Sequence, residues 1–246
     1  MLLSFYDYLI SHKSLFLYIS MGVFLILLIV LFVIFYIKKM RSMSRKNIIR
    51  HMTTIAIFAT LSIIFYLTFK FSLPIFPSFL EINFSNLPIL LGGFLLGPVE
   101  GMIIIIIRTI IVLPFSHTFF VGELADVIIS SSIMLISSII YFKNKTKKGA
   151  IYSLIFSNIV WVTVACLANY VILIPAYITL FFNGDINAFM PLLSVIPGVT
   201  EYNYKIKYIL FGNLPFNFLL SVTVNVCTYL VYKKLSILFH KFDDWV

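Results

Sequence analysis

The sequence predicts an all-α, polytopic membrane protein, and its composition, its long apolar runs and the placement of its basic residues each support that fold class. Of its 246 residues, 61% are hydrophobic and only 11% are charged, a balance that soluble globular domains do not have. The apolar residues gather in runs long enough to cross a bilayer. The basic residues gather in short segments between those runs, which indicates cytoplasmic loops and not a surface for nucleic acid.

The first apolar run covers residues 15–37 and has the length of a membrane-spanning helix. Basic residues follow this run, and no cleavage site of small residues is evident, so we interpret it as a helix and not as a signal peptide. Basic clusters within residues 38–50, 143–148 and 233–241 mark three cytoplasmic points. We therefore expect a multi-pass protein of the cell membrane, with its N-terminus outside and its C-terminus in the cytoplasm.

The number of spans between two cytoplasmic points must be even, and the length of residues 51–142 fits four spans between the first and second basic clusters. The expected core spans are residues 51–72, 86–96, 98–114, 121–142, 149–181 and 204–232, of which the second is short. Residues 182–203 are expected to form an external loop. The chain thus divides into an extra N-terminal helix with a basic linker, residues 1–47, and a six-helix substrate-binding core, residues 48–246.

Residues 73–101 are apolar but cannot form one helix. Pro74 and Pro77 break the stretch near its start, and Gly97 and Pro98 produce a tight turn near its end. Irregular backbone survives in a membrane only where it is buried in protein or lines a cavity. A broken apolar segment therefore indicates a substrate site, although an ordinary external loop followed by a short span is the alternative.

Arg108 lies in the middle of an isoleucine-rich run, where a charge is costly and normally faces a partner or a cavity. Glu123 and Asp126, on the next expected helix, are candidates to pair with it. Arg108 is accordingly either half of a structural ion pair or a contact to an anionic ligand.

Asn169 and Asn217 each lie near a proline and an aromatic residue inside an expected span. A carboxamide both donates and accepts hydrogen bonds, which suits the imide or ureide edge of a ligand. The alternative is a hydrogen bond between helices.

Ala56 and Thr60 form a pair of small residues, four positions apart, on the first core span. Such a pair lets another helix approach closely, either within the fold or from a partner.

The sequence contains no recognisable catalytic or metal-binding pattern. Cys166 and Cys227 lie inside apolar runs, and the four histidines are scattered without the spacing of metal ligands. The chain has no phosphate-binding loop and no hydrolase motif, so we expect no catalytic residue and no ATP hydrolysis by the chain itself.

Five segments occur in the order and spacing of a known family: FSLPIFPSFLEINFSNLPILLGGFLLGPVEG, VGELADVI, KTKKGA, LANYVILIPAY and LPFN. With these segments, the chain resembles the riboflavin-specific S component of energy-coupling factor (ECF) transporters. The resemblance covers about residues 48–238, and the helix at residues 15–37 lies outside it.

The resemblance implies a subunit that captures riboflavin or a close flavin as cargo, with no cofactor of its own. It would dock on a transmembrane scaffold, the T component, which two cytoplasmic ATPase subunits drive. Residues 73–85 match the segment that caps the pocket, and Ala56 and Thr60 match residues that face the scaffold. The expected substrate-binding residues are Asn169 and Asn217, which match the two that bond the flavin ring, together with Glu81, Asn83, Phe84, Arg108, Asp126 and Tyr170.

The chain departs from the family pattern at four places. Asn83-Phe84-Ser85-Asn86 replaces Asp-Phe-Ser-Asp, Arg108-Thr109 replaces Lys-Asn, Ala125-Asp126-Val127 replaces Ala-Asn-Phe, and Leu220 replaces a lysine. A second hypothesis is therefore a different vitamin or a nucleobase-like cargo, with Arg108 against an anionic group. A third is a membrane assembly or interaction protein, and a membrane enzyme is the least favoured.

Overall fold

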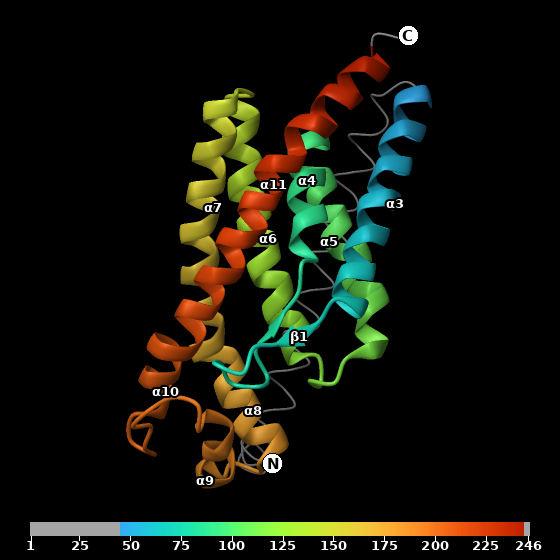
Figure 1. Ribbon diagram of the computed structural model, residues 1–246. Coiled ribbons are helices and arrows are strands. Elements are labelled where there is room, and N and C mark those ends of the chain that lie inside the picture. The colour runs from blue at the N-terminus through green and yellow to red at the C-terminus, as the bar shows by residue number, and fades with distance from the viewer. Residues whose placement is uncertain (1–44, 244–246) are drawn as a thin grey trace, which may run out of the picture. The chain divides into compact units, whose positions relative to one another are not determined.

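The computed structural model describes the backbone of residues 45–243, so the helix expected at residues 15–37 lies outside the described residues. The chain divides into two compact units, Met1–Arg50 and His51–Val246, and the second carries the fold discussed here (Figure 1). In chain order the described elements are α3 (Arg45–Thr68), β1 (Phe71–Ser72), β2 (Glu81–Ile82), α4 (Asn86–Leu96), α5 (Pro98–Val112), η1 (Leu113–Phe115), α6 (Val121–Lys143), α7 (Lys147–Ala168), η2 (Asn169–Leu173), α8 (Ile174–Phe181), α9 (Ile186–Phe189), η3 (Met190–Leu193), α10 (Tyr204–Lys207), η4 (Tyr208–Asn213) and α11 (Leu214–Asp243).

The expected core helices are confirmed, and five of them have the length and composition of membrane spans. Within the described part of the chain, five helical stretches are long and apolar enough to cross a bilayer: Asn47–Thr68, Pro98–Phe115, Val121–Lys143, Lys147–Phe181 and Tyr204–Leu235. The sixth, α4, is an apolar helix of only 11 residues. It is short because a glycine and a proline end it after three turns.

That break lies at Gly97 and Pro98. Gly97 has a φ of 120°, in the region that glycine adopts readily and other residues avoid. Pro98 begins α5, where its missing N–H would have had no helical partner. A Cβ atom on Gly101 would lie 3.2 Å from the Cα of Gly93 and against the sulfur of Met134. Glycine therefore lets α4, α5 and α6 pack closely.

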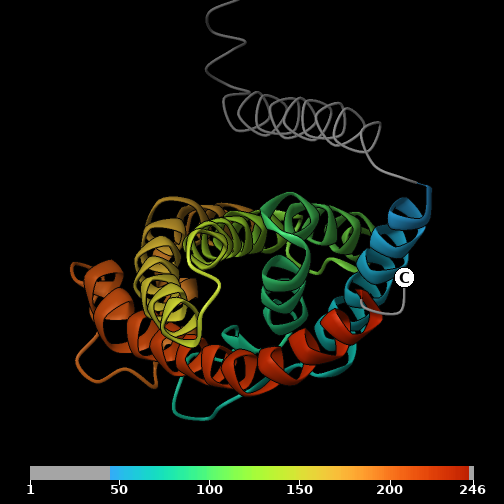
Figure 2. The same ribbon diagram turned by 90° about the horizontal axis from the view of Figure 1, so that it is seen from above.

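The helices of the second unit pack around α6 and α11. α6 contacts α4, α5 and α7, while α11 crosses the opposite side and contacts α4 and α7 (Figure 2). Buried serines tie these helices together. For example, the hydroxyl of Ser138 on α6 donates to the carbonyl oxygen of Gly93 on α4 at 2.7 Å.

One end of the unit is irregular. β1 and β2 form a short antiparallel pair in which Phe71 faces Ile82 and Ser72 faces Glu81, an element that the all-α expectation did not include. The segment between the strands turns inward, because Phe76 and Leu80 are buried in the hydrophobic core. α8, α9 and α10 lie at the same end (Figure 1). We call residues 73–85 the cap.

Candidate functional site

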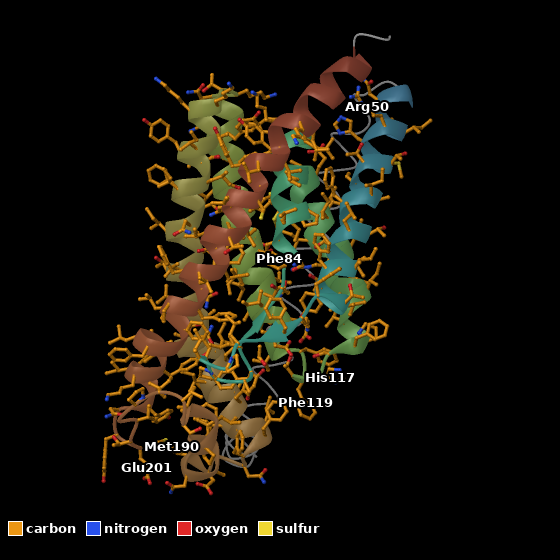
Figure 3. All side chains as sticks on the ribbon, in the orientation of Figure 1. Arg50, Phe84, His117, Phe119, Met190 and Glu201 are labelled. Carbon is orange, nitrogen blue, oxygen red and sulfur yellow. The ribbon has the colours of Figure 1, made fainter. Side chains whose placement is uncertain are left out.

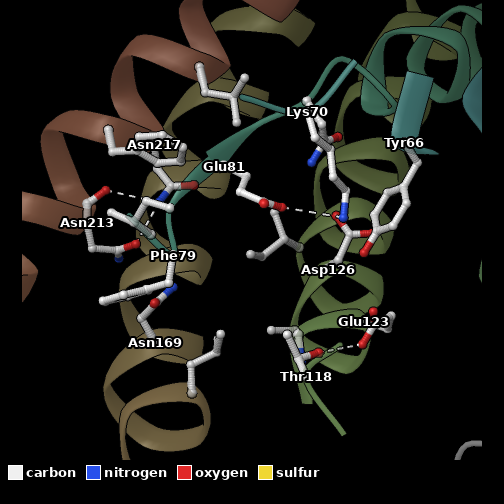
Figure 4. A pocket seen from close by; sticks show the side chains of 18 of the residues that line it. Tyr66, Lys70, Phe79, Glu81, Thr118, Glu123, Asp126, Asn169, Asn213 and Asn217 are labelled. Carbon is white, nitrogen blue, oxygen red and sulfur yellow. Dashed lines mark hydrogen bonds and ion pairs between the residues drawn. The ribbon is translucent and has the colours of Figure 1, made fainter. Parts of the chain in front are cut away.

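A cavity of about 730 Å³ lies under the cap, with walls from α3, α6, α7, η2, η4 and α11. Its volume is in the range of small-molecule sites in proteins. Two kinds of polar side chain line it on different sides. In Figure 4, Asn169, Asn213 and Asn217 gather on one side, whereas Lys70, Glu123 and Asp126 lie on the other.

The carboxamide side depends on two π-helical segments. Asn169 is the first residue of η2, and Asn213 is the last residue of η4. A π-helical turn is wider than an α-helical one and recurs at functional sites. Asn217 follows Asn213 by four residues, so both lie on the same face of the last helix.

Neighbouring groups fix the orientation of Asn169. Its Nδ2 donates to the carbonyl oxygen of Ala165 at 2.9 Å, and its Oδ1 accepts from the hydroxyl of Tyr208 at 2.7 Å. These bonds use one of two N–H groups and one of two lone pairs. The other N–H and lone pair of Asn169 are available to a molecule in the cavity.

Asn217 is oriented in the same way. Its Oδ1 accepts from the indole nitrogen of Trp161 at 3.2 Å, and its Nδ2 donates to the backbone oxygen and the Oδ1 of Asn213, at 3.0 and 2.7 Å. The Oδ1 of Asn217 retains a second lone pair, so this amide presents an acceptor to the cavity.

Aromatic rings form the apolar part of the cavity. The ring of Phe79, which the cap supplies, lies 5.8 Å from that of Tyr177 and 5.5 Å from that of Tyr208, measured between centroids. Trp161 and Phe216 also line the cavity. Rings set side by side in this way suit a flat, partly apolar ligand.

The other side of the cavity is acidic. Lys70 pairs with Glu81 at 3.5 Å, and its Nζ lies 4.1 Å from the centroid of the Tyr66 ring. Glu123 and Asp126 also line the cavity. Three carboxylates therefore line this side, together with Lys70 and His117.

Glu123 also holds the loop that borders the cavity. Its Oε2 accepts from the hydroxyls of Ser116 and Thr118, at 2.7 and 2.8 Å. The two residues after Thr118, Phe119 and Phe120, have φ of 48° and 67°. This left-handed conformation costs a bulky residue about 1–3 kcal/mol. The carboxylate thus fixes a strained loop at the edge of the cavity.

Arg108 lies behind this wall, since it is only 1% exposed and does not line the cavity. Its Nη2 pairs with Asp126 and donates to the hydroxyl of Ser130 at 3.2 Å, while its Nη1 donates to the hydroxyl of Ser85 at 3.0 Å. The guanidinium is therefore bound to protein groups, and of the two interpretations of Arg108, the structure shows the ion pair.

Comparison with known proteins agrees with this geometry. The family model described as ECF transporter, substrate-specific component, matches residues 50–232. The chain belongs to this family.

Relatives and a solved structure extend the match. The S component is 31% identical over 176 residues to "Riboflavin transporter RibU" of Staphylococcus aureus (strain TCH60), across 71% of this chain and 85% of that protein. It is 24% identical over 170 residues to "Riboflavin transporter FmnP" of Bacillus subtilis (strain 168), across 68% of this chain and 82% of that protein.

The fold resembles that of a chain from "Structure and mechanism of the S component of a bacterial ECF transporter", with a TM-score of 0.59 and 24% identity, covering 79% of this chain and 99% of that one. The protein is therefore a multi-pass membrane protein and the substrate-binding subunit of an ECF transporter, a transport component and not an enzyme.

The structure brings most of the expected substrate-binding residues of this S component together. Those that line the cavity are Asn169, Asn217, Glu81, Asn83 and Asp126. Phe84 packs against the hydrophobic core instead, and Arg108 lies behind the wall. Tyr170 is 47% exposed and is not part of the lining. Tyr170 was expected in the pocket but points away from it, because it follows Asn169 directly and adjacent residues of a helix point in different directions.

Several lining residues escaped the sequence analysis. Asn213 could have been predicted from its four-residue spacing from Asn217, which places both side chains on one face of the helix. Glu123 was considered only as a partner for Arg108. Trp161 and Lys70 gave no local signal, because an aromatic residue or a lysine near a span is common anywhere in a membrane protein. Phe79 was expected only as part of the capping segment, residues 73–85.

The Tyr208–Asn169 bond leads to a first prediction. Tyr208→Phe should lower the free energy of unfolding by about 1 kcal/mol, because a buried acceptor loses its donor. Chemical denaturation in detergent measures this change. Tyr170→Phe, which removes the same hydroxyl from an exposed ring close by, is the matched control and should have no effect. Equal losses in the two variants would contradict the assigned bond.

Proposed function

We propose that this S component binds riboflavin or a closely related neutral flavin. The arrangement of the cavity carries the proposal: two oriented carboxamides, Asn169 and Asn217, lie on one side and hydrogen-bonding carboxylates lie on the other. The two curated relatives, both named as riboflavin transporters, support the same cargo.

The chemistry of a flavin fits both sides. Its ring system is flat and carries an imide edge with an N–H group and carbonyl oxygens, which complement carboxamides. Its side chain is a row of hydroxyl groups, which donate well to the carboxylates of Glu81, Glu123 and Asp126. The aromatic rings around Phe79 suit the apolar part of the ring system.

A cargo with an anionic group is the second candidate, and the observed charges disfavour it. Arg108, the residue expected to attract such a group, is paired with Asp126 and does not line the cavity. The ionisable groups that line the cavity include three carboxylates, against one lysine and His117. Leu220, which replaces a lysine of the family pattern, adds an apolar surface to the lining.

We propose further that the subunit docks on the ECF T component, which two ATPase subunits drive. Ala56 and Thr60 support this interface, because both are exposed and, four residues apart, share one face of α3. The ATP hydrolysis would belong to the partner subunits.

The proposed orientation has the N-terminus outside and the C-terminus in the cytoplasm. The basic segment at the junction of α6 and α7, residues 143–148, lies at one end of the unit, together with the last turns of α11 (Figure 1). The labelled residues Met190 and Glu201 lie at the other end, beyond the cap, and His117 and Phe119 lie nearer the middle (Figure 3). Under the positive-inside rule, the cap and the cavity open outward.

The two carboxamides supply the direct test. Asn169→Ala and Asn217→Ala should each weaken riboflavin binding by about 1–3 kcal/mol, because a polar edge of the ligand loses its partner. Isothermal titration calorimetry measures the affinity. Asn158→Ala is the matched control, since Asn158 lies on α7, bonds to Ser221 and does not line the cavity. Unchanged affinity in the first two variants would refute the site.

The acidic side of the cavity predicts a preference between two flavins. Riboflavin 5′-phosphate carries a charge of about −1.5 to −2 at neutral pH. Its affinity should be at least about tenfold lower than that of riboflavin. Added salt should reduce this difference in affinity, because it screens the repulsion between the phosphate and the carboxylates of the cavity. Fluorescence titration at two salt concentrations measures both. Tighter binding of the phosphate would favour the anionic-cargo hypothesis.

Purification separates the transport proposal from the assembly alternative. We expect the membrane-extracted protein to carry a flavin, identified by absorbance and mass spectrometry. We also expect a transmembrane scaffold and two ATPases to co-purify with it, because an S component functions on such a complex. A protein free of small molecules that associates with neither would favour the assembly alternative.

A further inference from the structure

We infer that Arg108 is a positioning residue that holds the end of the cap against the cavity wall and thereby sets how long a bound cargo stays. This inference rests on the proposed function, since its main readout is the release of riboflavin. The guanidinium of Arg108, on α5, is buried and bonds at once to the end of the cap and to α6.

The first arm of this network reaches the cap. Nη1 of Arg108 donates to the hydroxyl of Ser85 at 3.0 Å, and that hydroxyl donates in turn to the Oδ1 of Asn83 at 2.7 Å. Asn83 lines the cavity. The backbone oxygen of Ser85 also accepts from the hydroxyl of Ser62 on α3, at 2.8 Å. Ser85 thus connects the guanidinium to the part of the cap that faces the ligand.

The second arm of the network reaches α6. Nη2 of Arg108 pairs with Asp126 and donates to the hydroxyl of Ser130 at 3.2 Å. The Ser130 hydroxyl donates to the Oδ1 of Asn86 at 2.6 Å. Asp126 and Asn86 both line the cavity. One side chain on α5 therefore bonds both to the end of the cap and to the α6 wall of the cavity.

The shape of the guanidinium is what this role requires. It is planar and presents several N–H donors in fixed directions, so it reaches Ser85 and Asp126 together. A lysine would keep the positive charge beside Asp126, but its compact ammonium group lacks the planar set of N–H donors that reaches Ser85 and Asp126 together. Arg108→Lys should therefore preserve the ion pair and loosen the cap.

Three variants distinguish a role of Arg108 in positioning the cap from a role in the stability of the whole fold. Removing the charge of Arg108 would leave Asp126 without its partner and endanger folding, so the test uses Ser85→Ala and Arg108→Lys. Ser138→Ala is the matched control. It removes a hydroxyl that is equally buried, and the Ser138 bond to Gly93 lies away from the cavity lining.

The first measurement is stopped-flow fluorescence of riboflavin released from the full-length protein. Ser85→Ala and Arg108→Lys should each raise the dissociation rate about fivefold to tenfold, as the loss of one buried hydrogen bond would. Ser138→Ala should leave the rate unchanged. The double variant of Ser85 and Arg108 should release riboflavin no faster than the faster single variant, because both changes break the same connection.

The second measurement is hydrogen exchange without ligand. The amides of Phe76 and Leu80, which donate within the cap to Leu73 and Pro77, should exchange faster in Ser85→Ala and Arg108→Lys but not in Ser138→Ala. The inference is overturned if Ser85→Ala and Arg108→Lys release riboflavin and exchange amide hydrogens at the rates of Ser138→Ala. It is also overturned if the effects of the two changes on the release rate add in the double variant. If riboflavin does not bind at all, the proposed function fails, and the exchange data alone decide the role of Arg108.

Discussion

A backbone inside a bilayer has no water to satisfy its N–H and C=O groups, so each of these groups must be paired within the protein. Among the described residues, long regular helices meet this requirement over most of the second unit, and irregular backbone gathers at one end of it. There the chain departs from the α-helix at the cap, at η2 and at η4. All three departures border the same cavity, where neighbouring side chains and a bound ligand can satisfy the groups that regular helices would otherwise pair.

The cavity combines two chemical environments because different helices supply its two sides. η2 and the last helix contribute neutral amides that are fixed by Tyr208 and Trp161. α6 contributes Glu123 and Asp126, and both carboxylates are already engaged, with hydroxyls of the neighbouring loop or with Arg108. Groups held in this way need little rearrangement when a ligand arrives, which lowers the cost of ordering the site on binding.

The spans were predictable because membrane crossing depends on local apolar length. The expected short span at residues 86–96 coincides with α4, since Gly97 and Pro98 act on their immediate neighbours. Asn169 and Asn217 were identifiable for a similar reason, as amides that would be costly if they faced lipid. The β1–β2 pair was missed because it spans only two residues in each strand and has no periodic signal of its own.

The sequence by itself determined the class of the protein, the limits of its core helices and the identity of the polar residues that must avoid lipid. Only the tertiary structure decided which polar groups meet. It placed Asn169 in the cavity and left Tyr170 exposed, and it turned Arg108 away from the cavity and toward Ser85 and Asp126. The physical reason is that hydropathy and length act along the chain, whereas the direction of a side chain and its partner depend on how helices distant in sequence pack.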